Sequence, residues 1–178
     1  LPDGIVDTDM LAAKAAKLGK IGDGGIIQVV EAKTTTEAAH DSVANTNYSS
    51  LSFDCNITPI STSSKIILTY SINFCTESVA REVSFRPTRG GTPFNTNSGD
   101  GARHVGTASR IIEYAGSSET ISWTCVDSPN TTSQVTYGFQ HSIMVSGCWI
   151  VRNRSFTNTN NGSHALGASF ITAMEVAG

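Results

Sequence analysis

The 178-residue sequence has few charges, no long apolar run and no basic cluster. Only 15% of its residues are charged, against about 25% in a typical soluble domain. Lys and Arg are scattered, which argues against the clustered basic surface of a nucleic-acid-binding protein. No stretch reaches the roughly 18 apolar residues of a membrane span, and the opening LPDGIVDTDML lacks the basic and apolar regions of a signal peptide. We therefore expect neither a nucleic-acid partner nor membrane insertion.

The sequence also lacks the motifs of common enzyme and metal sites. It contains no GxSxG, HExxH, phosphate-binding loop or calcium loop. The spacing of the four histidines is not that of metal ligands. In a homotrimer, one histidine on the threefold axis would be present three times, which is a further way to bind a metal. Acids are few after residue 25, and two carboxylates about 5–10 Å apart would be needed for glycoside cleavage. We predict no enzyme, no catalytic residue, no metal and no cofactor; a polysaccharide-degrading head is a minor alternative.

Cysteine is scarce, and its spacing excludes a typical zinc site. Cys55, Cys75, Cys125 and Cys148 are far apart, and no CxxC pair occurs. Most of them lie in strand-like runs, which favours four free and mostly buried thiols that pack as small apolar groups. One or two disulfides remain an open alternative at this stage.

Ser and Thr are abundant and together make up roughly a quarter of the chain, well above average usage. From Gly25 onward, apolar residues alternate or form short runs between turn residues, which predicts β-strands. We expect strands at 26–32, 48–57, 65–75, 79–86, 104–114, 120–126, 133–145, 148–151 and 165–176. Ser146-Gly147 is expected to form a tight turn between two strands of a hairpin. This pattern predicts an all-β fold, an antiparallel β-sandwich or jelly-roll-like head at residues 23–178.

The first 22 residues have a different pattern, which predicts a short helical stem. In DTDMLAAKAAKLGK, acids precede lysines, as the helix dipole favours, and Ala and Leu are strong helix formers. Ile5, Leu11, Ala15 and Leu18 form one narrow stripe, and about three turns of helix are unstable alone. We therefore predict that residues 1–22 form a trimeric bundle with a Gly-rich hinge. An amphipathic helix lying on its own β domain is the alternative.

Two loop regions supply candidate receptor contacts. The segment 87–103 is rich in Gly, Pro and Asn and is expected to be irregular and exposed; it offers Arg89, Phe94 and Asn95. The tip at 156–164 offers Phe156, Asn158 and Asn160. An aromatic ring flanked by amides can stack on a sugar while the amides bind its hydroxyls. Equally, Phe94 and Phe156 could fold inward or toward a neighbouring subunit.

Several segments, taken in order, resemble a recurrent module of tailed-bacteriophage virion proteins, including those of marine phages and phages of cyanobacteria. They are GKIGDGGIIQVVEAKTTTEA, NITPISTSSKIILTYSINF, FRPTRGGTPFN, DSPNTTSQVTYGFQ and the ending ITAMEVAG, with GIVDTDMLA before them. The resemblance covers nearly the whole chain. It implies a trimeric fibre or spike head, or a fibre-like capsid decoration, and it implies no catalytic residues. Pro87 departs from the family pattern and is expected to interrupt strand pairing.

The residues and the resemblance lead to one functional expectation. The chain is expected to be a phage virion structural protein, a trimeric fibre or spike head for host attachment. Its expected partners are two further copies, other virion proteins bound through the stem, and a host cell-surface glycan. The expected location is the virion, at a tail fibre, spike or capsid surface. A trimeric capsid decoration and a non-viral, carbohydrate-binding or adhesive β-sandwich remain alternatives.

Overall fold

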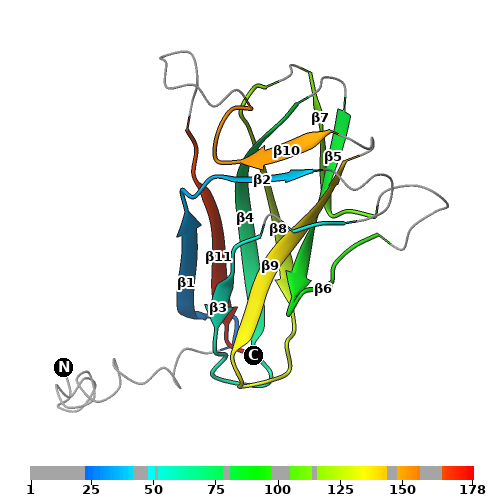
Figure 1. Ribbon diagram of the computed structural model, residues 1–178. Helices are drawn as coiled ribbons and strands as arrows, with labels where there is room; N and C mark the ends of the chain where they lie inside the picture. The colour runs from blue at the N-terminus through cyan, green and yellow to red at the C-terminus, as the bar shows by residue number, and fades with distance from the viewer. Residues whose placement is uncertain are drawn as a thin grey trace, which may run out of the picture.

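The computed structural model is an all-β fold of two antiparallel sheets (Figure 1). It describes residues 23–41, 48–50, 52–77, 81–97, 105–113, 116–143, 148–156 and 166–178. The predicted stem, with Ile5, Leu11, Ala15 and Leu18, lies outside these ranges, as do Asn158 and Asn160. Within the described ranges every regular element is a strand, so the predicted all-β class with two antiparallel sheets is confirmed.

The first sheet, sheet A, is built around the long strand β4. The strand pairs with β8 along one side and with β11 and then β10 along the other. The order across the sheet is β1-β11-β4-β10-β2, with β8 added on β4. Its strands are β1 (Ile26–Thr34), β2 (Ala38–Asp41), β4 (Lys65–Thr76), β8 (Glu119–Asp127), β10 (Trp149–Arg152) and β11 (Ser169–Val176).

The second sheet, sheet B, has the order β3-β9-β5-β6, and β7 also pairs with β5. Its strands are β3 (Cys55–Ile57), β5 (Arg81–Arg89), β6 (Thr92–Pro93), β7 (Ala108–Ile112) and β9 (Val135–Ile143). The expected alternation is clearest in β4, where every second residue from Ile66 to Phe74 is buried. These residues face the equivalent face of sheet B, and the packed core lies between the two sheets.

Aromatic rings from both sheets fill the centre of this core. Tyr70 stacks on Trp123, with ring centroids 4.5 Å apart and planes 4° apart. Phe85 of sheet B lies against Phe74, at 5.0 Å between centroids. The four cysteines are buried and none of them forms a disulfide, which confirms the expectation of buried thiols.

The expectation that Pro87 interrupts strand pairing is wrong. Strand β5 continues to Arg89, and Pro87 stays in register with Phe139 of β9. In an antiparallel ladder, the N–H and C=O of one residue point to the same side. The Pro87 carbonyl accepts from the Phe94 N–H at 3.2 Å, on the side away from β9. The missing N–H of Pro87 therefore faces that side as well, and no bond to β9 is lost.

Two other local predictions are corrected. The segment after Pro87 was expected to be irregular, yet Gly90 and Gly91, at φ 55° and 79°, form a two-residue turn between β5 and β6. Two positive φ values in succession are the requirement of a type I′ hairpin turn, which glycine meets without strain. The strands on either side of Ser146-Gly147 were expected to pair as a hairpin, yet β9 belongs to sheet B and β10 to sheet A; Ser146 and Gly147 themselves lie outside the described ranges.

The strand registers give the sandwich two distinct ends. Ile26, Val176, Lys65 and Asp127 lie near one end, next to Asp23, where the described chain begins; we call this the proximal end. The opposite, distal end contains the start of β8 and of β10 and residues 153–156 after β10 (Figure 1).

Candidate functional site

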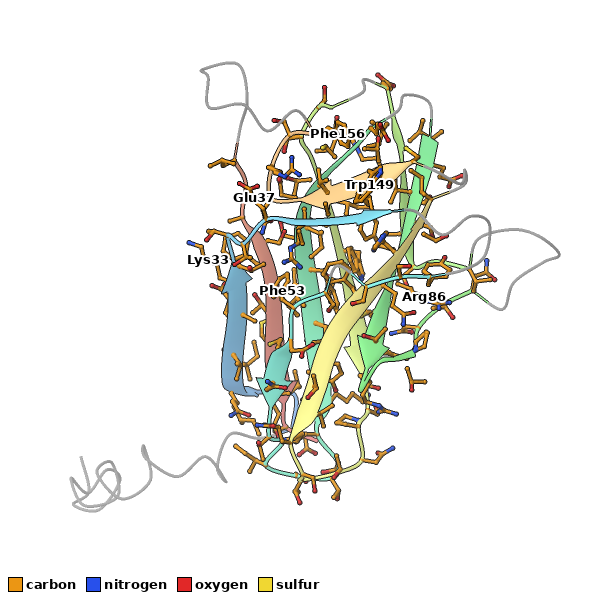
Figure 2. The ribbon with its side chains drawn as sticks, in the orientation of Figure 1. Lys33, Glu37, Phe53, Arg86, Trp149 and Phe156 are labelled. Carbon is orange, nitrogen blue, oxygen red and sulfur yellow. The ribbon has the colours of Figure 1, made fainter. Side chains whose placement is uncertain are left out.

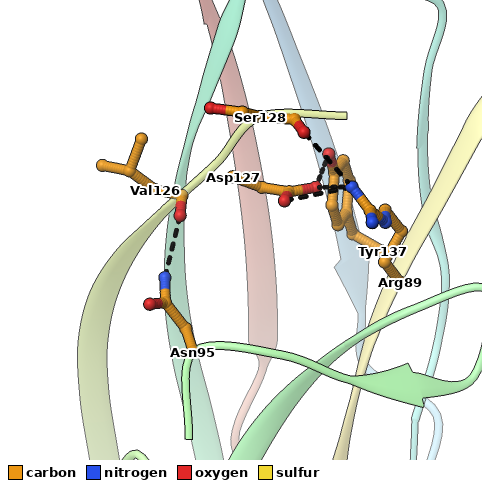
Figure 3. Close-up of polar contacts among 6 residues, drawn as sticks. All are labelled: Arg89, Asn95, Val126, Asp127, Ser128 and Tyr137. Atoms are coloured by element: carbon orange, nitrogen blue, oxygen red, sulfur yellow. Dashed lines mark hydrogen bonds and ion pairs between the residues drawn. The ribbon is translucent and has the colours of Figure 1, made fainter. Parts of the chain in front are cut away.

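A buried carboxylate organises the proximal end. Asp127, the last residue of β8, accepts two hydrogen bonds from Nη1 of Arg89, at 3.0 and 3.1 Å (Figure 3). The Tyr137 hydroxyl donates to the same carboxylate at 2.8 Å. Burial raises the pKa of the Tyr137 phenol far above its usual range, and the bond to Asp127 raises that pKa further. These three groups join β8, β5 and β9 and so tie the two sheets together.

Two of the predicted receptor-contact residues, Phe94 and Asn95, lie beside this cluster. The Asn95 amide donates to the Val126 carbonyl at 2.8 Å, and Asn95 has a φ of 52°. The Phe94 ring packs partly buried against the core, 6.0 Å from the ring of Tyr137. The Arg89 side chain is 43% exposed despite its ion pair. Phe94 and Asn95 thus make contacts inside their own chain, and Arg89 has both an internal partner and an exposed surface.

Phe156, the described residue of the second predicted loop, lies at the other end of the molecule (Figure 2). Its N–H donates to the Gly116 carbonyl at 3.4 Å, and its own carbonyl accepts from Nη1 of Arg154 at 2.9 Å. The structure therefore brings Arg89, Phe94 and Asn95 together at or near the proximal end and places Phe156 far from them. One surface cannot include all four residues.

Trp149, which the sequence analysis did not single out, is the exposed aromatic of the distal end (Figure 2). It is 41% exposed and is the only exposed aromatic side chain among the described residues. Its backbone is fixed by Glu77, whose carboxylate accepts the Trp149 N–H at 3.4 Å and whose N–H donates to the Trp149 carbonyl at 3.0 Å. The sequence contains a signal for the exposure of Trp149, because Trp149 lies between Cys148 and Ile150, which are both buried, and alternate residues of a strand face opposite sides.

Features of other kinds of site are limited in the described part of the chain. No three His, Cys, Asp or Glu residues gather there in a way that would hold a metal ion. No helix in those ranges has the length and apolar character to cross a membrane. An open depression at the edges of β7 and β8 is lined by Arg110, Ile111, Glu113 and Glu119, and an Arg110–Glu119 ion pair of 2.7 Å occupies part of it.

Comparison with known proteins gives likenesses to solved structures. No family model and no curated protein matches the sequence. Among solved structures, a chain from the structure of infectious bursal disease virus Gx strain is similar, with a TM-score of 0.44 and 14% sequence identity. The match covers 85% of this chain and 37% of that chain, so this chain spans little more than a third of its length. Similarity at this level assigns neither a family nor a function.

Proposed function

We propose that the chain is the head of a homotrimeric fibre or spike on the virion of a tailed bacteriophage. In this proposal residues 1–22 join three copies and bind other virion proteins, and the distal end attaches to a glycan on the host surface. The proposal gives the protein a role in assembly and binding and no catalytic role. Its basis is the resemblance of the sequence to phage virion modules, together with the all-β sandwich.

One observation carries the attachment part of the proposal. The described chain begins at the proximal end, whereas Trp149 is exposed at the distal end (Figure 2). A head held to a particle at one end presents its opposite end to the cell. The residue that supplies a broad apolar ring is therefore placed where a surface ligand would first be met.

The exposed indole at this end suits the apolar face of a sugar ring. An indole ring stacks on the apolar face of a pyranose, and buried area of this kind contributes at about 25 cal/mol per Å². Trp149 sits in a backbone position held by two hydrogen bonds to Glu77, so little backbone ordering is needed on binding. Phe156 lies partly exposed at the same end and is a second candidate contact.

Attachment is tested by binding the full chain to host cells and to their purified surface polysaccharide. We expect Trp149→Ala to lose most of the binding, while Ile111→Ala keeps it. Ile111 is a fair control because it is 61% exposed and lies on β7 of the other sheet. Equal binding by the two variants and the unchanged protein would contradict the proposed contact. Polymer length should stay constant during the assay, since a shortened polymer would indicate a degrading enzyme.

The trimer and the location are tested separately. Light scattering of the full chain should give a mass near three times 18.8 kDa. Imaging of labelled particles should place the protein on the virion, and its position there distinguishes a tail fibre or spike from a capsid decoration. A monomer that binds glycan and is absent from particles would favour the non-viral carbohydrate-binding module.

A further inference from the structure

The outer face of sheet A carries a continuous apolar row across four strands. The register places Val29 of β1 beside Met174 of β11, Met174 beside Ile67 of β4, and Ile67 beside Val126 of β8. Val29 is 59% exposed and Val126 is 48% exposed. Four strands about 4.8 Å apart make this row roughly 14 Å wide between its outer backbones. The solvent side of an antiparallel sheet is usually polar, so this row is a departure from the normal alternation.

The surface beside the row is uncharged on β4, β8 and β11, whereas β1, at the edge of the sheet, carries Glu31 and Lys33 on this face. The next row along the strands contains Thr172, Thr69 and Thr124, and the one after it contains Phe170, Ser71 and Ser122. Among the outward residues of β4, β8 and β11, Lys65 at the proximal end is the charged one in the described register. Over β4, β8 and β11, a face with this apolar row can approach another such face with Lys65 as the one charge to desolvate.

Exposed apolar side chains are concentrated where the described chain begins. Of the seven large apolar residues that are exposed within the described ranges, Ile26, Val29, Ile60 and Val126 lie at or near the proximal end. Ile26 is three residues from Asp23, so the C-terminal boundary of residues 1–22 lies within about 11 Å of it. If residues 1–22 bring three copies together, this end of sheet A is the part of each head that is held nearest to the other two.

We infer that the neighbouring copies of this chain are what cover the apolar row. In the trimer, the outer face of sheet A packs against an adjacent head, with Val29, Met174, Ile67 and Val126 at the contact. This inference rests on the proposed trimer. The row and its neighbouring Thr residues are fewer than the roughly 20–30 residues a side of a standard interface, so the stem and the row act together.

Thiol labelling of the full chain tests this contact. We compare Val126→Cys with the control Ile111→Cys, which lies on β7 of sheet B and is exposed in the single chain. The four natural cysteines are buried, so the unchanged protein gives a low background. A thiol at a contact reacts only when that contact opens. We therefore expect Val126→Cys to react about tenfold or more slowly than Ile111→Cys in a protein that light scattering shows to be a trimer.

The other outcomes overturn the inference in distinguishable ways. A trimer in which both thiols react at the same rate keeps the proposed assembly and removes the head contact. A monomer removes the trimer as well, and a monomer with a protected Val126→Cys identifies residues 1–22 of the same chain as the cover. Val29→Cys, compared with Lys33→Cys on the same strand and face, repeats the test if Val126→Cys does not fold.

Discussion

The two ends of the sandwich are held by different chemistry. At the proximal end, buried carboxylates are central: Asp127 binds Arg89 and Tyr137, and Glu175 accepts the Ile60 N–H at 2.7 Å. At the distal end, the central buried polar group is a side-chain amide.

This amide belongs to Asn153, which is fully buried and has a φ of 63°. Its amide donates to the carbonyls of Thr34 and Thr36, at 3.0 and 2.9 Å, and accepts from the Ser169 hydroxyl at 2.6 Å. An amide both donates and accepts, whereas a carboxylate only accepts and must be surrounded by donors. The comparison teaches that the buried polar centre of the proximal end contains an ionised group, whereas the one around Asn153 contains none and the Arg110–Glu119 ion pair of the distal end is more exposed.

The largest expected effect is at the proximal end. Asp127→Ala leaves the buried Tyr137 hydroxyl without its acceptor and Arg89 without its ion pair, so the free energy of unfolding should fall by about 3 kcal/mol. The control is Glu119→Ala, at the other end of the same strand, whose ion pair with Arg110 is more exposed and should contribute about 0–1 kcal/mol. Urea unfolding measures both, and equal losses would contradict a special role for Asp127.

A somewhat smaller loss is expected at the distal end. Asn153→Ala removes three buried hydrogen bonds and places alanine at a positive φ, and we expect a loss of about 2 kcal/mol. Asn130→Ala provides the comparison, because Asn130 has a similar φ of 53° but is exposed. The difference between the two variants gives the contribution of the hydrogen bonds. It should be the same at pH 5 and pH 8, since the amide does not titrate there.

The proximal end should instead respond to alkaline pH. Burial raises the pKa of Tyr137 in the folded state, so folding favours the protonated phenol. Its contribution to stability is complete below the unfolded pKa of about 10 and is lost as pH rises above it. Above pH 10 the unchanged protein should lose up to about 1.4 kcal/mol per pH unit more than Tyr137→Phe. Parallel curves of unfolding free energy against pH for the two proteins would show that Tyr137 is not responsible.

Other buried groups also reduce stability at alkaline pH, and they are present in both the unchanged protein and Tyr137→Phe. Burial raises the pKa of Cys75 to about 12 and that of Cys125 to about 11. Both thiols therefore add to the alkaline loss of stability from about pH 9 upward. Because they are present in both proteins, they affect both curves equally and cancel in the difference.

The smallest expected effect on stability is that of Trp149→Ala at the distal end. The ring is 41% exposed and its neighbours are held by backbone bonds, so unfolding should change by less than about 1 kcal/mol. A loss of glycan binding in this variant would then be a direct effect on the surface. If Trp149→Ala unfolds as readily as Asn153→Ala, the ring is part of the packing and the binding result has no meaning for attachment.

The sequence predicted the strands that have strong alternation and missed those defined by their partners. In β4, five alternate apolar residues from Ile66 to Phe74 decide which face of the strand is buried. The predicted strand, 65–75, ends one residue before the observed one. Strand β2, with the sequence AAHD, has no such pattern. It is a strand because β10 offers it a ladder, and a ladder between residues more than 100 positions apart is not visible in local sequence.

The candidate site was predicted less well, for a related physical reason. Loop composition identified Arg89, Phe94 and Asn95 as polar and aromatic groups, but it could not reveal Asp127, Val126 and Tyr137 as their partners. Pro87 was misjudged because its effect depends on which neighbouring strand its missing N–H faces. The Gly90-Gly91 turn, by contrast, carried a recognisable local signal.

The position of β11 in sheet A has a consequence for how the protein is made. Strand β11 lies between β1 and β4, and 134 residues, 35–168, separate it from β1. At about 5–20 residues per second, a ribosome needs several seconds or more to supply those residues. During this time β1 has no partner within sheet A, and folding must wait for contacts between distant residues. A nascent chain that stops before β11 cannot close the sheet, so a prematurely ended chain cannot present the completed outer face to its neighbours.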